Sequence, residues 1–172
     1  MNDPIETRWQ GKYIAAKTEG RWEYVSRVRS IGAAVILAID AGHVILVEQY
    51  RVPLKANCLE LPAGLVGDET AGEPIETAAA RELEEETGYR AGSVERIGQF
   101  ASSPGMVSET FTLVRARDLV KVHDGGGVEG ENITVHRVAL GDVPAFIAAK
   151  REAGVQMDVK LLLLLGSGLL AE

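Results

Sequence analysis

The sequence is short of cysteine and of positive charge. A single cysteine, Cys58, excludes an internal disulfide, and its setting in Cys-Leu-Glu-Leu predicts a small apolar strand residue rather than a nucleophile. Lys and Arg number 18 against 25 Asp and Glu, which gives a net charge of −7. This negative net charge does not favour binding to nucleic acid or to an anionic membrane. An anionic ligand would need a cation to bridge it to the protein.

Long apolar runs are also missing. The run over residues 161–170 is shorter than the roughly 20 residues that span a bilayer, and it indicates a buried terminal helix starting at about Met157. Residues 1–6 have neither the basic start nor the apolar core of a secretory signal. We therefore expect a cytoplasmic protein without a membrane partner.

The remaining pattern predicts an α/β fold. Apolar, β-branched runs at residues 33–39 and 44–49 flank Asp40-Ala41-Gly42, which is typical of a hairpin turn. Further strands are expected at residues 58–61, 94–100, 111–116 and 133–139, and helices at residues 74–87, 143–152 and 157–170. A mixed sheet between helices follows.

The N-terminal part has a different pattern. Short segments around Trp9, Tyr13 and Trp22–Val28 are separated by glycines and predict a small antiparallel meander. Such a meander is too small to be stable alone, so it must pack on the core or on another subunit. We assign residues 1–30 to this meander and residues 31–172 to the main domain.

The most informative segment is Arg-Glu-Leu-Glu-Glu-Glu-Thr-Gly at residues 81–88. A helix over residues 74–87 places Glu82, Glu85 and Glu86 in its last two turns, within an arc of about 100°. Like charges at this spacing, and anions at the C-terminal end of a helix, each cost about 0.2–1 kcal/mol. A divalent cation is the natural compensation, and a solvated acidic helix end is the alternative.

The spacing around this segment is G-x5-E-x7-R-E-L-x-E-E-x-G-Y over residues 67–89. It resembles the Nudix box at eight of its nine specified positions, and the ninth, usually aliphatic, is Tyr89. The opening glycine is Gly67 by spacing, although Gly64 in Leu-Pro-Ala-Gly resembles the turn before the box in one branch of the family. The resemblance implies a Nudix-type α/β/α sandwich with a mixed sheet.

The resemblance also implies metal-dependent hydrolysis of a diphosphate bond. Mg²⁺ or Mn²⁺ prefers oxygen ligands, and two or more ions would activate water and screen phosphate charge. The implied metal site comprises the carbonyl of Ala63 and the carboxylates of Glu82, Glu85, Glu86 and Glu131. Arg81, grouped with Glu85 among the catalytic residues, either orients the neighbouring glutamates or is only a helical partner of Glu85 or Thr77.

Residues outside the box resemble the ADP-ribose pyrophosphatase branch. Pro104 stands fifteen residues after Tyr89, and the segments 22–27, 48–51 and 60–64 are similar to that branch. The implied substrate is ADP-ribose or a related ADP-sugar, cleaved to AMP and ribose 5-phosphate. The implied substrate contacts are Tyr13, Trp22, Glu23, Arg27, Arg51, Pro104 and Glu109.

In that branch the general base is a glutamate on a loop after the box. Glu129 and Glu131 follow three glycines at residues 125–127, which we interpret as a mobile loop, and Glu109 is the competitor. We take Glu129 as the base. The three histidines have no ligand spacing and are interpreted as structural: His43, His123 and His136.

The branch further implies a homodimer in which Tyr13 and Trp22 enclose adenine, one from each subunit. The alternative is that both side chains only seal the meander against its own core. Two other functions stay open: hydrolysis of other nucleoside diphosphate derivatives, and nucleotide binding without cleavage, as in a sensor.

Overall fold

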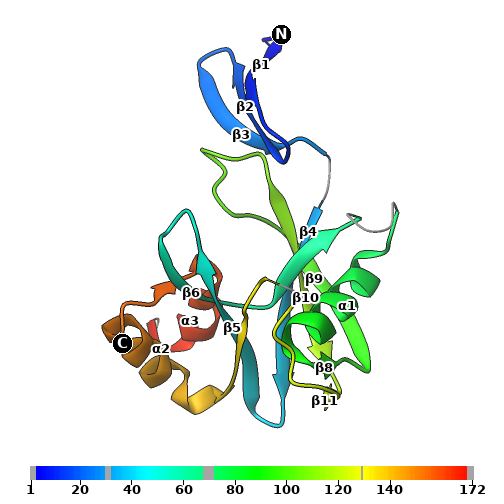
Figure 1. Cartoon of the computed structure of the whole chain (residues 1–172), viewed down its shortest axis with the longest axis vertical. Coiled ribbons are helices and arrows are strands. Elements are labelled where there is room, and N and C mark those ends of the chain that lie inside the picture. Colours follow the sequence, from blue (N-terminus) through cyan, green and yellow to red (C-terminus); the bar gives the residue numbers. More distant parts are fainter. Residues whose placement is uncertain (1–2, 30–31, 68–71, 129, 170–172) are drawn as a thin grey trace.

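The computed structural model describes residues 3–29, 32–67, 72–128 and 130–169 and shows an N-terminal sheet above a larger α/β body (Figure 1). The N-terminal strands are β1 (Ile5–Gln10), β2 (Ile14–Glu19) and β3 (Trp22–Arg27). The strands of the body are β4 (Gly32–Asp40), β5 (His43–Arg51), β6 (Ala56–Glu60), β7 (Ala63–Val66), β8 (Tyr89–Arg90), β9 (Ser93–Ala101), β10 (Thr110–Arg117), β11 (Val120–Lys121), β12 (Thr134–Ala139) and β13 (Gln156–Met157). The α-helices are α1 (Ile75–Thr87), α2 (Val143–Glu152) and α3 (Leu162–Leu169), and the 3-10 turns are η1 (Leu140–Asp142) and η2 (Val159–Leu161).

The main sheet is mixed and has the order β13-β6-β5-β4-β10-β9, with β12 paired to β5 and β7 paired to β4. Strand β10 runs parallel to β4, and β9 runs antiparallel to β10. Helix α1 lies on one side of the sheet, and α2 and α3 lie on the other (Figure 1). This arrangement confirms the predicted α/β/α sandwich.

Strand β4 shows why the central run is apolar throughout. Its side chains alternate between two cores: Val35 and Leu37 pack in the cluster that contains Ile147 of α2, and Ile36 packs in the cluster that contains Leu83 of α1. A strand covered on both faces needs apolar residues at every position.

The hairpin between β4 and β5 forms as predicted but stays short. Ala41 and Gly42 have φ values of 45° and 74°, as a two-residue turn of this kind requires. The two strands pair only at Ile39↔Val44 and Asp40↔His43. Beyond that point β4 pairs with β7 and β10, whereas β5 pairs with β6 and β12. The divergence of these two strands makes room for a cleft.

The N-terminal sheet is an antiparallel meander, as predicted, and it meets the body at one loop. The amide of Val25 donates to the carbonyl of Met106 at 2.9 Å, and the amide of Ser108 donates to the carbonyl of Val25 at 3.0 Å. Strand β3 therefore docks on residues 102–109, between β9 and β10.

The prediction of a buried helix over residues 157–170 is wrong in its boundaries and its burial. Residues 156–157 extend the sheet as β13, and the buried apolar side chain belongs to Leu161 in η2. Helix α3 has no buried residue, and Leu163 is 52% exposed.

None of the described helices is long and apolar enough to cross a bilayer. Four short strands were also not predicted: β7, β8, β11 and β13.

A buried carboxylate joins several elements of the body. Glu48 on β5 accepts hydrogen bonds from Lys150 of α2 at 2.6 Å and from Asn57 of β6 at 3.0 Å, and it lies 3.0 Å from His136 Nε2 of β12. Burial alone would raise the pKa of Glu48, but these hydrogen bonds outweigh it and lower the pKa from 4.5 to about 2. His136 thus has a structural contact, in agreement with its predicted role.

The Glu48 contacts should make stability depend on pH. The pKa of Glu48 is lower in the folded protein than in the unfolded chain. Its contacts therefore stabilise the folded state above about pH 4.5, and this stabilisation is lost as the pH falls towards 2. Glu48→Gln should lower the free energy of unfolding by about 1.5–3 kcal/mol at pH 7, and the difference from the wild type should shrink in acid. Urea denaturation from pH 2 to 7 measures this. Glu95→Gln, on exposed strand β9, is the matched control, and a pH-independent difference for Glu48→Gln would contradict the assignment.

Candidate active site

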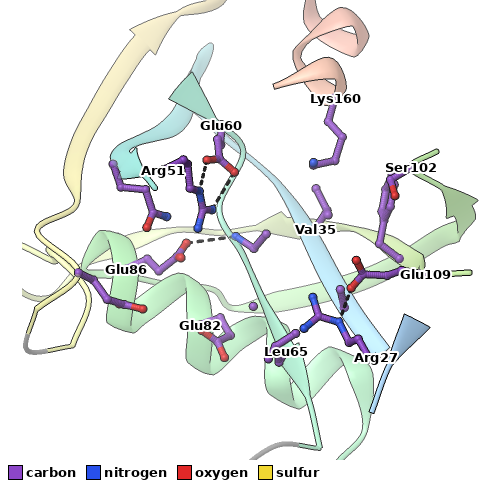
Figure 2. A pocket seen from close by; sticks show the side chains of 16 residues that line it. Arg27, Val35, Arg51, Glu60, Leu65, Glu82, Glu86, Ser102, Glu109 and Lys160 are labelled. Atoms are coloured by element: carbon purple, nitrogen blue, oxygen red, sulfur yellow. Dashed lines mark hydrogen bonds and ion pairs between the residues drawn. The ribbon is translucent and has the colours of Figure 1, made fainter. Parts of the chain in front are cut away.

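A cleft of about 540 Å³ lies where β4 and β5 separate. It brings together side chains from the meander, the central strands, α1 and the C-terminal segment (Figure 2). Its lining residues are Arg27, Ala33, Val35, Gln49, Arg51, Glu60, Ala63, Gly64, Leu65, Glu82, Glu86, Ser102, Glu109, Phe111, Glu131 and Lys160. The concentration of charged groups in one concave site marks it as the candidate active site.

Helix α1 presents its acidic end to this cleft. The helix ends at Gly88, whose φ of 70° and amide hydrogen bond to Glu84 O at 2.7 Å form a left-handed C-cap. Of the three predicted metal ligands on this helix, Glu82 and Glu86 line the cleft. Glu84 lies outside the lining and pairs with Arg90 at 2.8 Å, so it points away from the site.

Glu86 is a buried carboxyl of this helix. It is 6% exposed, and its Oε2 accepts a hydrogen bond from the amide of Ala63 at 3.1 Å. Burial, together with the nearby Glu82 and Glu131 carboxylates, raises the pKa of Glu86 to about 8, although the Ala63 amide and Arg51 oppose the shift. Burial in this position therefore disfavours the anionic form of Glu86, and a further positive charge would favour it.

Gly64 allows Glu82 to reach the cleft. A Cβ atom at Gly64 would lie 2.0 Å from Glu82 Cδ, so no other residue fits against this carboxylate without displacing it. Gly67 has a different constraint, a φ of 85°. The contact with Glu82 thus favours glycine at position 64, and the backbone conformation favours glycine at position 67.

Arg81 holds the glutamates that surround it. Its guanidinium lies 3.0 Å from Glu82, 3.2 Å from Glu85 and 3.5 Å from Glu73. It therefore makes the helical contact with Glu85 and also contacts Glu82 and Glu73. Glu85 is partly exposed and is not among the cleft-lining residues.

The donor groups of the cleft suit a hard divalent cation. Glu82, Glu86 and Glu131 offer only oxygen atoms, and Glu86 is buried next to two other carboxylates. In the described residues, no three acidic, histidine or cysteine side chains already form a ready-made metal site. Glu82 and Glu85 contact Arg81, whereas Glu86 turns towards β7, so binding of an ion requires these side chains to reorient.

Two arginines in the cleft are each held by a carboxylate. Arg51 donates to both Glu60 oxygens, at 2.5 and 2.9 Å, and these hydrogen bonds raise the pKa of Arg51 above its usual value. Arg27, at the end of β3, donates to Glu109 at 2.5 Å (Figure 2). Fixed guanidinium groups are well suited to binding phosphate oxygens. Arg27, Arg51 and Glu109 were predicted from the sequence, and Glu60 was not predicted as a site residue.

The three glycines at residues 125–127 pack on the end of α1. The amides of Gly126 and Gly127 donate to the carbonyls of Glu86 and Glu85 at 2.9 and 3.1 Å. A Cβ atom at Gly125 would lie 2.5 Å from Thr87 C, so this contact requires glycine. These glycines satisfy carbonyls that a helix end leaves unpaired, and the mobility of the loop stays a prediction.

The following loop brings Glu131 into the cleft, where its Oε2 also accepts a hydrogen bond from the amide of Val128 at 2.9 Å. Glu129 lies outside the described residues. Its predicted role as general base therefore stays a prediction.

Several residues predicted to bind adenine or other parts of the substrate do not line the cleft of their own chain. Tyr13 and Trp22 are 68% and 55% exposed, and neither they, Glu23 nor Pro104 are among the lining residues. Trp22 pairs with Glu19 at the far end of β3, five residues from Arg27, which is roughly 16 Å along a strand. Pro104 belongs to the loop on which β3 docks.

Comparison with known proteins agrees with this geometry. Residues 28–154 match the family profile described as NUDIX domain. The methanol dehydrogenase activator of Bacillus methanolicus is 37% identical over 72% of this chain, and the ADP-ribose pyrophosphatase of Bacillus subtilis is 36% identical over 72%. The chain covers 66% of the length of each of these relatives.

A crystal structure of an ADP compounds hydrolase has the same fold. It matches with a TM-score of 0.74 and 24% sequence identity, over 98% of this chain and 93% of that one. This likeness extends through the N-terminal meander as well as the body.

Proposed function

Because the chain belongs to the Nudix domain family, we propose that it hydrolyses the diphosphate bond of ADP-ribose or a closely related ADP-sugar, releasing AMP and ribose 5-phosphate. The observation that carries this proposal is the cleft itself, in which Glu82, Glu86 and Glu131 face Arg27 and Arg51. Carboxylates for metal ions and guanidinium groups for phosphate oxygens are the two requirements of this chemistry. The name of the Bacillus subtilis relative supports the choice of substrate.

The chain's own groups would hold Mg²⁺ or Mn²⁺ at the acidic end of α1. The proposed ligands are the carbonyl of Ala63 and the carboxylates of Glu82, Glu85, Glu86 and Glu131. Bound ions would screen the phosphate charge and lower the pKa of a coordinated water. Arg81 keeps the neighbouring glutamates oriented.

The remaining groups position the substrate and accept a proton. Arg51, fixed by Glu60, and Arg27, fixed by Glu109, hold the diphosphate in one orientation. Glu129 is the proposed base, because in the sequence it follows the glycine segment whose amides donate to the main-chain carbonyls of Glu85 and Glu86. A base placed there can take the proton of the attacking water.

The proposal is tested by assaying the purified protein against a panel of nucleotide sugars, including ADP-ribose and GDP-mannose, with and without Mg²⁺. ADP-ribose should give AMP and ribose 5-phosphate with the highest kcat/KM, and a chelator should stop the reaction. Preference for another nucleoside diphosphate derivative would move the assignment to that substrate. Tight binding without cleavage would favour a sensor.

We further propose that the protein acts as a homodimer in which Trp22 of one subunit stacks on the base bound by the other. The distance of Trp22 from the cleft residue Arg27 along β3 leaves its own cleft out of reach. Large exposed aromatic side chains also favour a binding role.

Trp22→Ala should raise KM about 5- to 150-fold with a smaller effect on kcat, since stacking a base on an aromatic ring contributes roughly 1–3 kcal/mol. Trp9→Ala, an equally exposed tryptophan of the same sheet, is the matched control. Light scattering should give about twice the chain mass of 18.4 kDa. A fully active monomer would contradict the shared site.

A further inference from the structure

Lys160 lies in the cleft but outside the segment that carries the family pattern. The family match ends at residue 154, and Lys160 belongs to η2 in the C-terminal segment. Figure 2 shows its side chain pointing into the cleft from the side opposite α1. The Nudix box therefore assigns no role to this residue.

The ammonium group of Lys160 is held in place. Asp158 accepts from the Lys160 amide at 2.8 Å and from its Nζ at 2.6 Å, while the Asp158 amide donates to Leu59 O at 3.0 Å. The ammonium also lies 5.6 Å from the centre of the Phe111 ring. These contacts hold the Lys160 ammonium against β6 and β10. The Lys160 side chain therefore has little conformational entropy left to lose when a ligand binds.

The charge of Lys160 differs from that of the two arginines. Arg27 and Arg51 each pair with a carboxylate that itself lines the cleft, whereas Asp158 is not among the lining residues. An ammonium has three N–H donors, so two remain beyond the one that Asp158 accepts. Lys160 is therefore the cationic side chain of the described cleft whose paired carboxylate lies outside the lining.

We propose that Lys160 binds a phosphate group of the substrate from the wall opposite the acidic end of α1. This inference rests on the proposed function, because it takes the ligand to be a nucleoside diphosphate compound. Metal ions on the α1 side and the ammonium on the other side would neutralise the diphosphate from both directions. Asp158 is then a positioning residue that holds the ammonium in the cleft.

Lys160→Met tests this role, because methionine keeps the apolar stem against Phe111 and removes the charge. KM for ADP-ribose should rise about tenfold or more with little change in kcat, as expected for loss of a charge-assisted hydrogen bond used in binding. Lys160→Arg should stay within about threefold of the wild type. Lys55→Met, in the exposed turn before β6, makes the same change in net charge and should leave KM unchanged. A lower Tm with unchanged KM would overturn the proposal and leave Lys160 as a support of the C-terminal segment.

Binding without turnover separates this inference from the proposed function. Calorimetric titration with ADP-ribose in the presence of a chelator should show at least tenfold weaker binding by Lys160→Met, and equal affinities would overturn the proposal. If the wild type neither cleaves nor binds ADP-ribose, the proposed function has failed and inorganic pyrophosphate becomes the probe. Weaker binding of pyrophosphate by Lys160→Met would support the phosphate contact, and equal or undetectable binding would overturn it.

Discussion

Glu86→Gln is expected to lower kcat by about 10³-fold or more while the fold stays as stable as the wild type or becomes more stable. A bound metal contributes several kcal/mol to the transition state, and each 1.4 kcal/mol is about tenfold in rate. Stability is kept because burial raises the pKa of Glu86 to about 8. At pH 7 the metal-free protein already holds a largely neutral group of the same shape.

Glu84→Gln is the matched control for this substitution. Glu84 is on the same helix, but it pairs with Arg90 outside the cleft. Its change to glutamine should leave kcat near the wild-type value. The measurements are initial rates with ADP-ribose at several Mg²⁺ concentrations and a denaturation curve for each variant. Normal hydrolysis by Glu86→Gln would show that the metal assignment is wrong.

Glu129→Gln is expected to lower kcat by about 10²–10⁴-fold with little change in KM, the range for loss of a general base. The same substitution at the other two candidates should give different results. Glu109 holds Arg27 at 2.5 Å, so Glu109→Gln should act mainly on KM. Glu131 lines the cleft near Glu86, so Glu131→Gln should mainly raise the Mg²⁺ concentration needed for half-maximal activity.

Steady-state kinetics with varied substrate and varied Mg²⁺ distinguish these three outcomes. If the large kcat loss occurs in Glu131→Gln or Glu109→Gln while Glu129→Gln is active, the role of base moves to that residue. Denaturation curves for each variant show whether a loss of activity reflects a loss of folded protein.

The acidic helix could be predicted from the sequence because its determinants are local. The start at Pro74, the stop at Gly88 and the side on which Glu82 and Glu86 lie all follow from helical periodicity and terminal preferences. The same applies to the turn at Ala41 and Gly42. Such features depend on neighbours within a few residues, so the sequence determined them by itself, together with the family to which the chain belongs.

The glycines after α1 have a packing role that local reasoning did not reveal. Three consecutive glycines predict flexibility, but here they let the backbone approach the carbonyls at the end of α1. Gly64 is a similar case, since its lack of a side chain serves Glu82, eighteen positions along the chain. A sequence records that a glycine is present but not which neighbour requires it.

The cleft itself was decided by the tertiary structure. It exists because β4 and β5 separate after two residue pairs, and its walls come from segments far apart in sequence. Arg27 meets Glu109 across 82 positions, and Lys160 enters from beyond the family segment. These contacts depend on how strands pair and how the terminal segment packs on the sheet. The sequence by itself therefore determined the acidic helix, and the packing of distant segments decided which cationic side chains face it.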